Sequence, residues 1–217
     1  MNYLTLDTET CNTFDDPFAY DIGGAVHDEW GNVRETFSFV IDEVFNGMKD
    51  LMAECYFADK IPQYEKDIEE GSRKVVKMVY AKMYINNLCK KYNVKAIICH
   101  NARFDYRSTA TTQRFLTKSK YRHFLPYGVE LWDTLKMARQ VMPHIPMFTR
   151  FCEVNGFTTK NNKPQLTAEV LYRWITKDVD FVESHTGLED VLIEKEIFSY
   201  FVRQGFFKKI EKTCFKR

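Results

Sequence analysis

The sequence predicts a mixed α/β domain, in which three antiparallel strands are followed by strands that alternate with helices. Three observations lead to this fold class. The first 41 residues contain three strand-like apolar runs, two of them joined by a Gly-Asn turn. Later apolar runs are separated by stretches with helical spacing. The chain has 217 residues and is 45% hydrophobic, which is enough for one substantial core.

The strands are expected in the first half of the chain. The opening strand should cover residues 2–8, and a hairpin should join a strand over 22–27 to one over 33–41, "VRETFSFVI". "VKAIICHN", residues 94–101, is largely apolar and ends in polar residues, which is typical of a buried strand.

Helical spacing indicates where the helices lie. We expect one helix over residues 72–91, with Ser72 as its N-cap and apolar positions at Val75, Val79, Met83, Tyr84 and Leu88. Further helical stretches lie in "LWDTLKMARQVM" and "QLTAEVLYRWI". The last long helix should run from Thr186 to Arg203 and begin with a capping box, Thr186 to Glu189. Residues 43–71 form an irregular acidic stretch that can include a short helix.

The formal net charge of +1 conceals a segregation of charge. Residues 1–70 carry 17 acidic and 4 basic residues, whereas residues 71–217 carry 13 acidic and 27 basic ones. Residues 103–150 alone hold nine Lys and Arg against three acids. The basic half is either ordinary solvated surface or a face that follows nucleic-acid phosphates beside an acidic metal site.

The cysteines and the termini bear on location. The six cysteines show neither a C-x-x-C pair nor zinc-type spacing, so we expect reduced thiols in a cytoplasmic protein. There is no apolar run of about 18 residues, so we expect no membrane association. The N-terminus does not have the layout of a signal peptide.

The opening strand carries two carboxylates. Asp7 and Glu9 are two residues apart and therefore share one face of the strand, while Leu4, Leu6 and Thr8 face the opposite way. Two carboxylates that lie so close together need a cation or a shared proton. Oxygen ligands suit Mg²⁺ or Mn²⁺. The alternative is a pair of surface acids near a strand end.

Two further motifs carry acids. "HNARFD", residues 100–105, follows the buried strand and ends in Asp105, which is either a site residue or a helix cap. "SHTGLED", residues 184–190, places His185 just before the last helix and Asp190 inside it. The two can converge on one point if His185 belongs to the preceding loop, although a single His is more often structural.

Together, D-x-E, N-x-x-F-D and H-x₄-D in this order resemble the DEDDh family of 3′–5′ exonucleases, the DnaQ-like branch of the ribonuclease H-like fold. "DIGGAVHDEWGNVRETFSFVI" resembles the second and third strands of that family, and "LWDTLKMAR" resembles the segment between its second and third motifs. The resemblance covers nearly the whole chain, so we expect one exonuclease domain over residues 1–217. Two departures are Gly187, where the family usually has Ala, and the long stretch at about 43–71, which would be an elaboration of this chain.

The resemblance implies roles for individual residues. Asp7, Glu9, Asp105 and Asp190 would be catalytic carboxylates that hold two Mg²⁺ or Mn²⁺ ions. His185 would be the general base. The positions that would contact the terminal nucleotide are Thr8, Thr10 and Asn101.

The implied function is metal-dependent 3′–5′ hydrolysis of phosphodiester bonds in a single-stranded or frayed nucleic acid, with release of nucleoside monophosphates. We favour DNA and a proofreading or replication-associated role, in which a polymerase or another replication protein would be a partner. A compact enzyme of this kind would suit a phage replication cluster. The alternatives are an exoribonuclease of the oligoribonuclease or RNase T type, and a non-catalytic nucleic-acid-binding module that keeps the fold.

Overall fold

The computed structural model describes residues 1–13, 15–117 and 123–214. Within these ranges the chain forms one six-stranded sheet in the order β4-β3-β2-β1-β5-β6. The antiparallel part consists of β1 (Asn2–Cys11), β2 (Phe18–Asp28) and β3 (Val33–Ile41). Three strands run parallel to a neighbour, namely β4 (Lys74–Val76), β5 (Val94–Cys99) and β6 (Glu130–Asp133).

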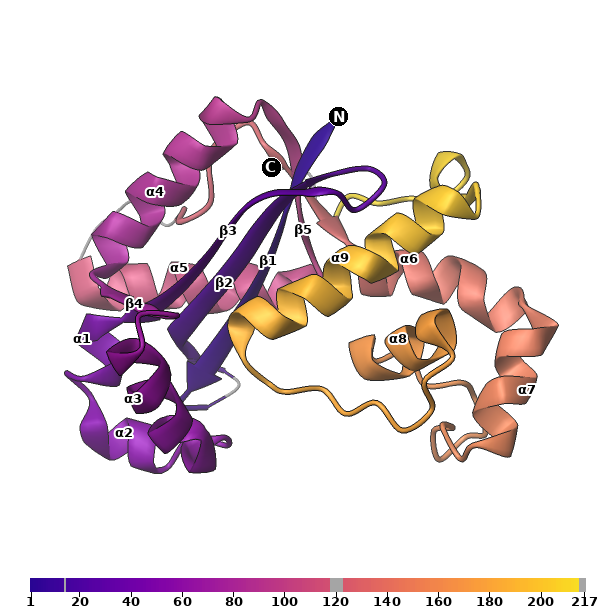
Figure 1. Cartoon of the computed structure of the whole chain (residues 1–217), viewed down its shortest axis with the longest axis horizontal. Helices are drawn as coiled ribbons and strands as arrows, with labels where there is room; N and C mark the ends of the chain where they lie inside the picture. Colours follow the sequence, from indigo (N-terminus) through magenta and orange to yellow (C-terminus); the bar gives the residue numbers. More distant parts are fainter. Residues whose placement is uncertain (14, 118–122, 215–217) are drawn as a thin grey trace.

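Helices cover both faces of this sheet (Figure 1). The first half of the chain supplies α1 (Asp42–Phe45), α2 (Lys49–Ala53), η1 (Ala58–Lys60), α3 (Ile61–Glu69), α4 (Met78–Lys91) and α5 (Ala102–Thr117). The second half supplies α6 (Thr134–Val141), η2 (Met142–His144), α7 (Pro146–Val154), α8 (Ala168–Thr176), α9 (Gly187–Arg203) and η3 (Phe206–Lys208). In the described part of the chain, no helix combines the length and the apolar character that a membrane span requires.

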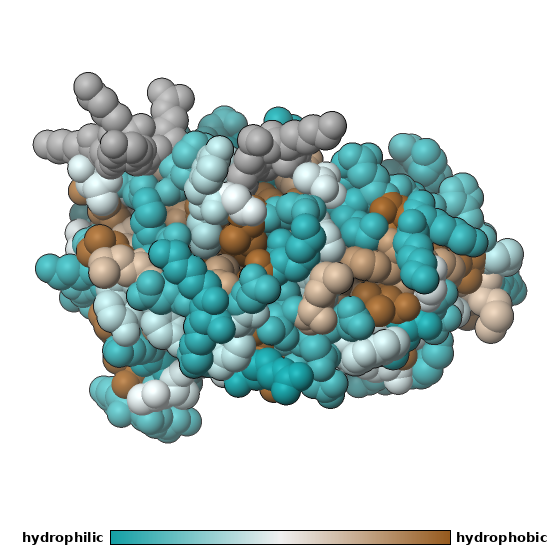
Figure 2. Space-filling model, turned by 90° about the horizontal axis from the view of Figure 1, so that it is seen from above, coloured by the Kyte–Doolittle hydropathy of each residue, from teal (hydrophilic) through white to brown (hydrophobic). Residues whose placement is uncertain are grey.

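The sheet divides two hydrophobic cores, because successive side chains of a strand point to opposite faces. Leu4 and Ile97 pack on one face, in the core that α4 contributes to. Tyr3 and Ile98 pack on the other face, in the core with α6 to α9. The outer surface seen in Figure 2 is mostly hydrophilic, and apolar side chains appear there only as small separate patches. This architecture confirms the predicted fold class.

The predicted helix over residues 72–91 is wrong at its N-terminal end. Val75 and Val76 belong to the edge strand β4, where they pair with Val40 and Ile41 of β3. β-branched residues suit a strand that adds to an existing sheet edge. The helix therefore begins at Met78, and Ser72 does not cap it.

The buried face of α4 also differs from the expected stripe. Val79 and Met83 are 53% and 60% exposed. The residues that pack inward are Met78, Ala81, Ile85, Leu88 and Cys89. Because each residue advances the helix by about 100°, Met78, Ala81, Ile85 and Leu88 share one face, and Val79 and Met83 lie on the opposite side.

The last helix begins at Gly187 with Thr186 at the N-cap, as expected, but without the predicted capping box. The Thr186 hydroxyl donates a hydrogen bond of 2.5 Å to the carboxylate of Glu189, and its oxygen accepts no cap hydrogen bond from a backbone N–H of the helix. Glu189 in turn pairs with Arg73 at 2.9 Å. The ion pair holds the Glu189 side chain away from the N-cap backbone that a capping box requires.

Candidate active site

The carboxyl end of β1 lies beside the N-termini of α5 and α9. Asp7 and Glu9 come from β1, Asp105 from the first turn of α5, and Asp190 from the first turn of α9. All four line one cavity of about 600 Å³. His185, Asn101 and Thr8 line the same cavity. The alternation along β1 therefore places Asp7 and Glu9 together, as the sequence predicts.

Burial and nearby negative charges raise the pKa of every carboxyl in this group. Burial comes first for each of them, and it brings the pKa of Glu9 and Asp190 to about 8 and that of Asp105 to about 7. The pKa of Asp7 is raised well above its ordinary value by burial and then by Glu194 and Asp105. Carboxylates in this situation bind protons or cations, so the oxygen donors present fit a divalent metal such as Mg²⁺ or Mn²⁺.

His185 joins this cluster from the loop before α9. Its backbone has a φ of 54°, in the left-handed region, and this turn directs the chain into the helix. One ring nitrogen of His185 and one carboxylate oxygen each of Glu9 and Asp190 lie within 4.8 Å of one another. Burial lowers the pKa of the imidazole, which favours its neutral, proton-accepting form.

The acidic stretch over residues 43–71, expected to be largely irregular, instead folds into several short helices and contributes directly to the cavity. The ring of Phe57 stacks on the imidazole of His185, with the ring centres 4.6 Å apart and the planes at 18°. Phe57 also lines the cavity with the carboxylates. The sequence motifs give no signal for such a residue, because Phe57 lies in a stretch without a motif.

A buried ion cluster connects α3 to the start of α9. The Asp21 carboxylate, which is 0% exposed, accepts hydrogen bonds from Tyr64 of α3 at 2.6 Å and from the Gly187 backbone N–H at 2.9 Å. Arg73 contacts the same Asp21 oxygen at 3.1 Å and also pairs with Glu189 at 2.9 Å. This network fixes the chain immediately after His185, at Gly187 and Glu189.

The approach of β2 to α9 explains the glycine that departs from the family pattern. A Cβ atom on Gly187 would lie 2.9 Å from the backbone nitrogen of Gly23, closer than real Cβ contacts allow. A Cβ on Gly23 would lie 2.2 Å from the carbonyl carbon of Gly187. The two glycines let the helix terminus touch β2 at the position that pairs with Asp7.

Glu194 is a fifth carboxylate in the cavity, and the motifs do not include it. It lies one helical turn after Asp190 and is 3% exposed. Its Oε2 accepts a hydrogen bond of 3.1 Å from the backbone N–H of His100. The signal for it is the i, i+4 spacing from Asp190, which puts both residues on one helix face in an otherwise apolar stretch.

His100 ties together the segments around the cavity. Its ring nitrogens contact the Thr134 hydroxyl at 3.0 Å and the Leu166 carbonyl oxygen at 2.8 Å. Burial lowers its pKa to about 4, so the ring is neutral. Asp133 acts nearby as the N-cap of α6 and accepts a hydrogen bond from the Asn101 backbone N–H at 3.2 Å.

The three residues expected to contact a nucleotide occupy different positions. Asn101 is exposed at the rim of the cavity with a φ of 72°. The Thr8 hydroxyl donates a hydrogen bond of 2.9 Å to Asp105, so its side chain orients a carboxylate. Thr10 follows an irregularity in the β1–β2 pairing and is not among the described residues that line the cavity. Contact of any of them with a nucleotide stays a prediction.

Comparisons with known proteins agree with this fold. No family model and no curated protein sequence matches the chain. Among solved structures, cell-death related nuclease 4 (CRN-4) superposes with a TM-score of 0.59 at 16% identity, over 94% of this chain and 64% of that one. E. coli exonuclease I in complex with a dT13 oligonucleotide gives 0.56 at 17% identity, over 95% of this chain and 42% of that one.

A third solved structure, S. pombe Pop2p with Mg²⁺ and Mn²⁺ bound, gives a TM-score of 0.53 at 16% identity. The superposition covers 96% of this chain and 86% of the Pop2p chain. The chain thus has the ribonuclease H-like fold that is found in these nucleases, and it spans less than two thirds of the length of the first two.

Proposed function

We propose that the protein is a divalent-metal-dependent 3′–5′ exonuclease that removes nucleoside monophosphates from the 3′ end of a single-stranded or frayed nucleic acid. One observation carries the proposal. Four carboxylates from three separate elements converge with a histidine in one cavity. The order of these residues along the chain is also the order of the DEDDh motifs.

The four carboxylates, Asp7, Glu9, Asp105 and Asp190, would hold two metal ions. The chemistry that such ions supply is acidification of a water molecule and stabilisation of the leaving 3′-oxyanion. The neighbouring Thr8 hydroxyl orients Asp105 for this role.

His185 would act as the general base. Its neutral imidazole accepts the proton of the attacking water at a ring nitrogen, beside Glu9 and Asp190. The stacked ring of Phe57 limits the orientation of that imidazole. The Asp21 and Arg73 cluster limits the position of the loop that carries it.

The polar rim of the cavity would orient the substrate. Arg139, from the segment that resembles the family motif, lines the cavity with Asn101. In the described part of the chain Arg139 has no ion-pair partner, so its guanidinium is available for a phosphate. We favour DNA as the substrate, and the neighbour solved with an oligodeoxynucleotide supports this choice.

The test is digestion of 5′-labelled single-stranded DNA and RNA of one sequence, with Mg²⁺ or Mn²⁺ and with an EDTA control. A metal-dependent ladder that shortens from the 3′ end supports the proposal, and the faster substrate identifies the class. Asp7→Asn should abolish the ladder, while the exposed Asp50→Asn on α2 serves as the matched control. Binding without cleavage by the wild-type protein would favour the non-catalytic module instead.

We further propose that the enzyme acts in replication inside the cell, with a polymerase or another replication protein as partner. The six cysteines show neither a C-x-x-C pair nor zinc-type spacing, and this pattern, which favours reduced thiols, supports an intracellular location. Copurification of a polymerase with the tagged protein from its native host would test it.

A further inference from the structure

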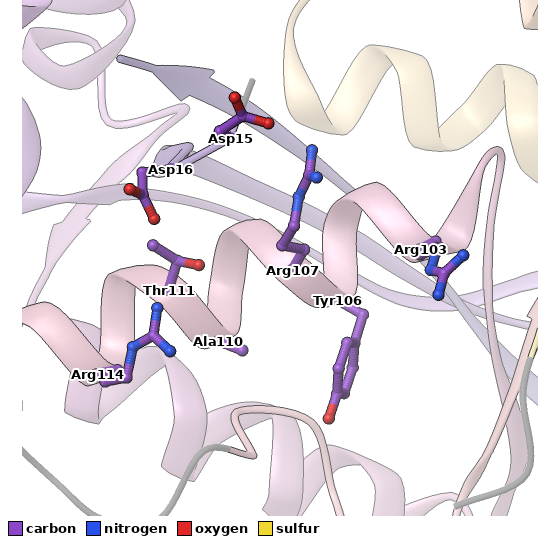
Figure 3. Close-up of a pocket in the computed structure, with 8 residues that line it drawn as sticks. All are labelled: Asp15, Asp16, Arg103, Tyr106, Arg107, Ala110, Thr111 and Arg114. Atoms are coloured by element: carbon purple, nitrogen blue, oxygen red, sulfur yellow. The ribbon is translucent and has the colours of Figure 1, made fainter. Parts of the chain in front are cut away.

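A second groove runs along the exposed side of α5, next to the catalytic cavity. It has a volume of about 560 Å³, and it is named here the α5 groove. Its lining residues are Asp15, Asp16, Arg103, Tyr106, Arg107, Ala110, Thr111 and Arg114. Figure 3 shows the three arginines spaced along α5, with the two aspartates on the segment that precedes β2.

The start of α5 contributes side chains to both the catalytic cavity and the α5 groove. Asn101 and Asp105 line the cavity, and Arg103 lies between them in sequence but lines the α5 groove. Both spaces therefore open around the first turn of α5. From Arg103 to Arg114 the helix rises about 16 Å, since each residue adds about 1.5 Å.

The arginines fall into two groups, those that pair with a carboxylate and those that do not. Among residues 1–13, 15–117 and 123–214, five arginines pair with a carboxylate, namely Arg34, Arg73, Arg150, Arg173 and Arg203. The four described arginines without such a pair are Arg103, Arg107, Arg114 and Arg139. Each of these four lines either the α5 groove or the catalytic cavity.

We propose that the α5 groove binds the phosphates of the substrate strand on the 5′ side of the bond that is cut. This inference rests on the proposed function and adds a binding surface to it. Guanidinium groups without carboxylate partners are free to pair with phosphates. A row of them that leads away from a 3′-end site matches the path of a strand. Tyr106 adds an aromatic ring beside the row, on which a base can stack.

Asp15 and Asp16 line the same groove as the arginines, so substitutions in the groove are predicted to either strengthen or weaken binding of a strand. Neither Asp15 nor Asp16 forms an ion pair with a groove arginine within the described residues. Their charges therefore oppose a phosphate chain that lies on α5. Removing them should tighten binding, whereas removing the arginines should weaken it.

The experiment measures binding of fluorescein-labelled dT20 by anisotropy in EDTA, at 50 to 200 mM KCl, so that no cleavage occurs. The test variant combines Arg103→Gln, Arg107→Gln and Arg114→Gln. The matched control removes the same charge from three paired arginines, by Arg34→Gln, Arg150→Gln and Arg203→Gln.

The groove variant should bind at least about tenfold more weakly at 50 mM KCl. The slope of log affinity against log salt should become shallower by about 2, because each of the three lost phosphate contacts accounts for about 0.7. The control should keep the wild-type slope. Asp15→Asn with Asp16→Asn should bind more tightly than the wild type. An unchanged slope in the groove variant, or an equal loss in the control, would overturn the inference.

A small substrate separates this inference from the proposed function. The p-nitrophenyl ester of thymidine 5′-monophosphate fills only the terminal position, so the groove variant should hydrolyse it at the wild-type rate while it degrades dT20 slowly. If the wild-type protein hydrolyses neither substrate, the proposed catalysis fails, and the binding measurement still decides the role of the groove. A loss of ester hydrolysis in the groove variant would show that the arginines support the catalytic cavity and would overturn the inference.

Discussion

Replacing Asp190 by Asn should stabilise the metal-free protein. Asp190 is 5% exposed, and burial, followed by the charges of Glu183 and Glu9, raises its pKa to about 8. In the unfolded chain an Asp has a pKa of about 4. Between these two pH values the folded chain holds a proton that the unfolded chain has released, so the free energy of unfolding falls as pH rises. An Asn side chain removes this penalty.

The size of the effect follows from the pKa difference. Each pH unit above the unfolded value costs about 1.4 kcal/mol until the folded pKa is reached. The penalty is absent below about pH 4, amounts to about 1 to 2 kcal/mol at pH 5, and reaches about 4 kcal/mol at pH 7. These figures are upper bounds, because the neighbouring carboxyls also change their proton occupancy when one charge is removed.

The assay is urea unfolding in EDTA at pH 5, 6 and 7, followed by tryptophan fluorescence. Asp190→Asn should exceed the wild type in stability by a margin that grows with pH, and the exposed Asp50→Asn should show no such trend. Adding Mg²⁺ at about 100 times its Kd should stabilise the wild type by about 3 kcal/mol and the variant far less. A variant that is less stable than the wild type at pH 7 in EDTA would refute the reasoning.

Three further predictions concern the surroundings of the metal cluster. His185→Ala should lower turnover by about 10²- to 10⁴-fold while Mg²⁺ still stabilises the protein, and a loss of that stabilisation would make His185 a ligand. Phe57→Ala should lower kcat by about 10- to 100-fold with little change in KM, because the imidazole of His185 loses its stacking partner. The control is Tyr56→Ala, which removes an 89% exposed ring. An equal effect of both variants would contradict the role of Phe57 in orienting His185. Arg73→Gln should lower the free energy of unfolding in urea by about 3 to 5 kcal/mol, because it leaves the Asp21 charge buried without its cation. Adding Asp21→Asn should restore part of this stability. If the effects of the two substitutions simply add, the ion pair does not contribute as described.

The pattern of the sequence predicts those parts of the fold and the site that depend on local spacing. The period of two along β1 placed Asp7 and Glu9 on one face, and the run of apolar residues before Asp105 marked β5. The parallel edge strand β4 was missed, because residues 74–76 are short and their valines also fit a helical stripe. Pairing with β3 decided between the two possibilities.

The contacts that complete the cavity depend on residues far apart in the chain. Phe57 reaches His185 across 128 positions, and Arg73 reaches Glu189 across 116. No periodicity records such a contact, so a single sequence does not reveal it. Glu194 is different, since its spacing from Asp190 is local and a search for buried acids on the helix face would have identified it.

The most direct test of the account is digestion of a single-stranded oligonucleotide in H₂¹⁸O with Mg²⁺, followed by mass spectrometry of the products. Hydrolysis at the 3′ end by an activated water predicts nucleoside 5′-monophosphates that carry one ¹⁸O on the phosphate, and a shortened strand with an unlabelled 3′-hydroxyl. Release of nucleoside 3′-monophosphates, internal fragments as the first products, or ¹⁸O retained on the shortened strand would contradict it.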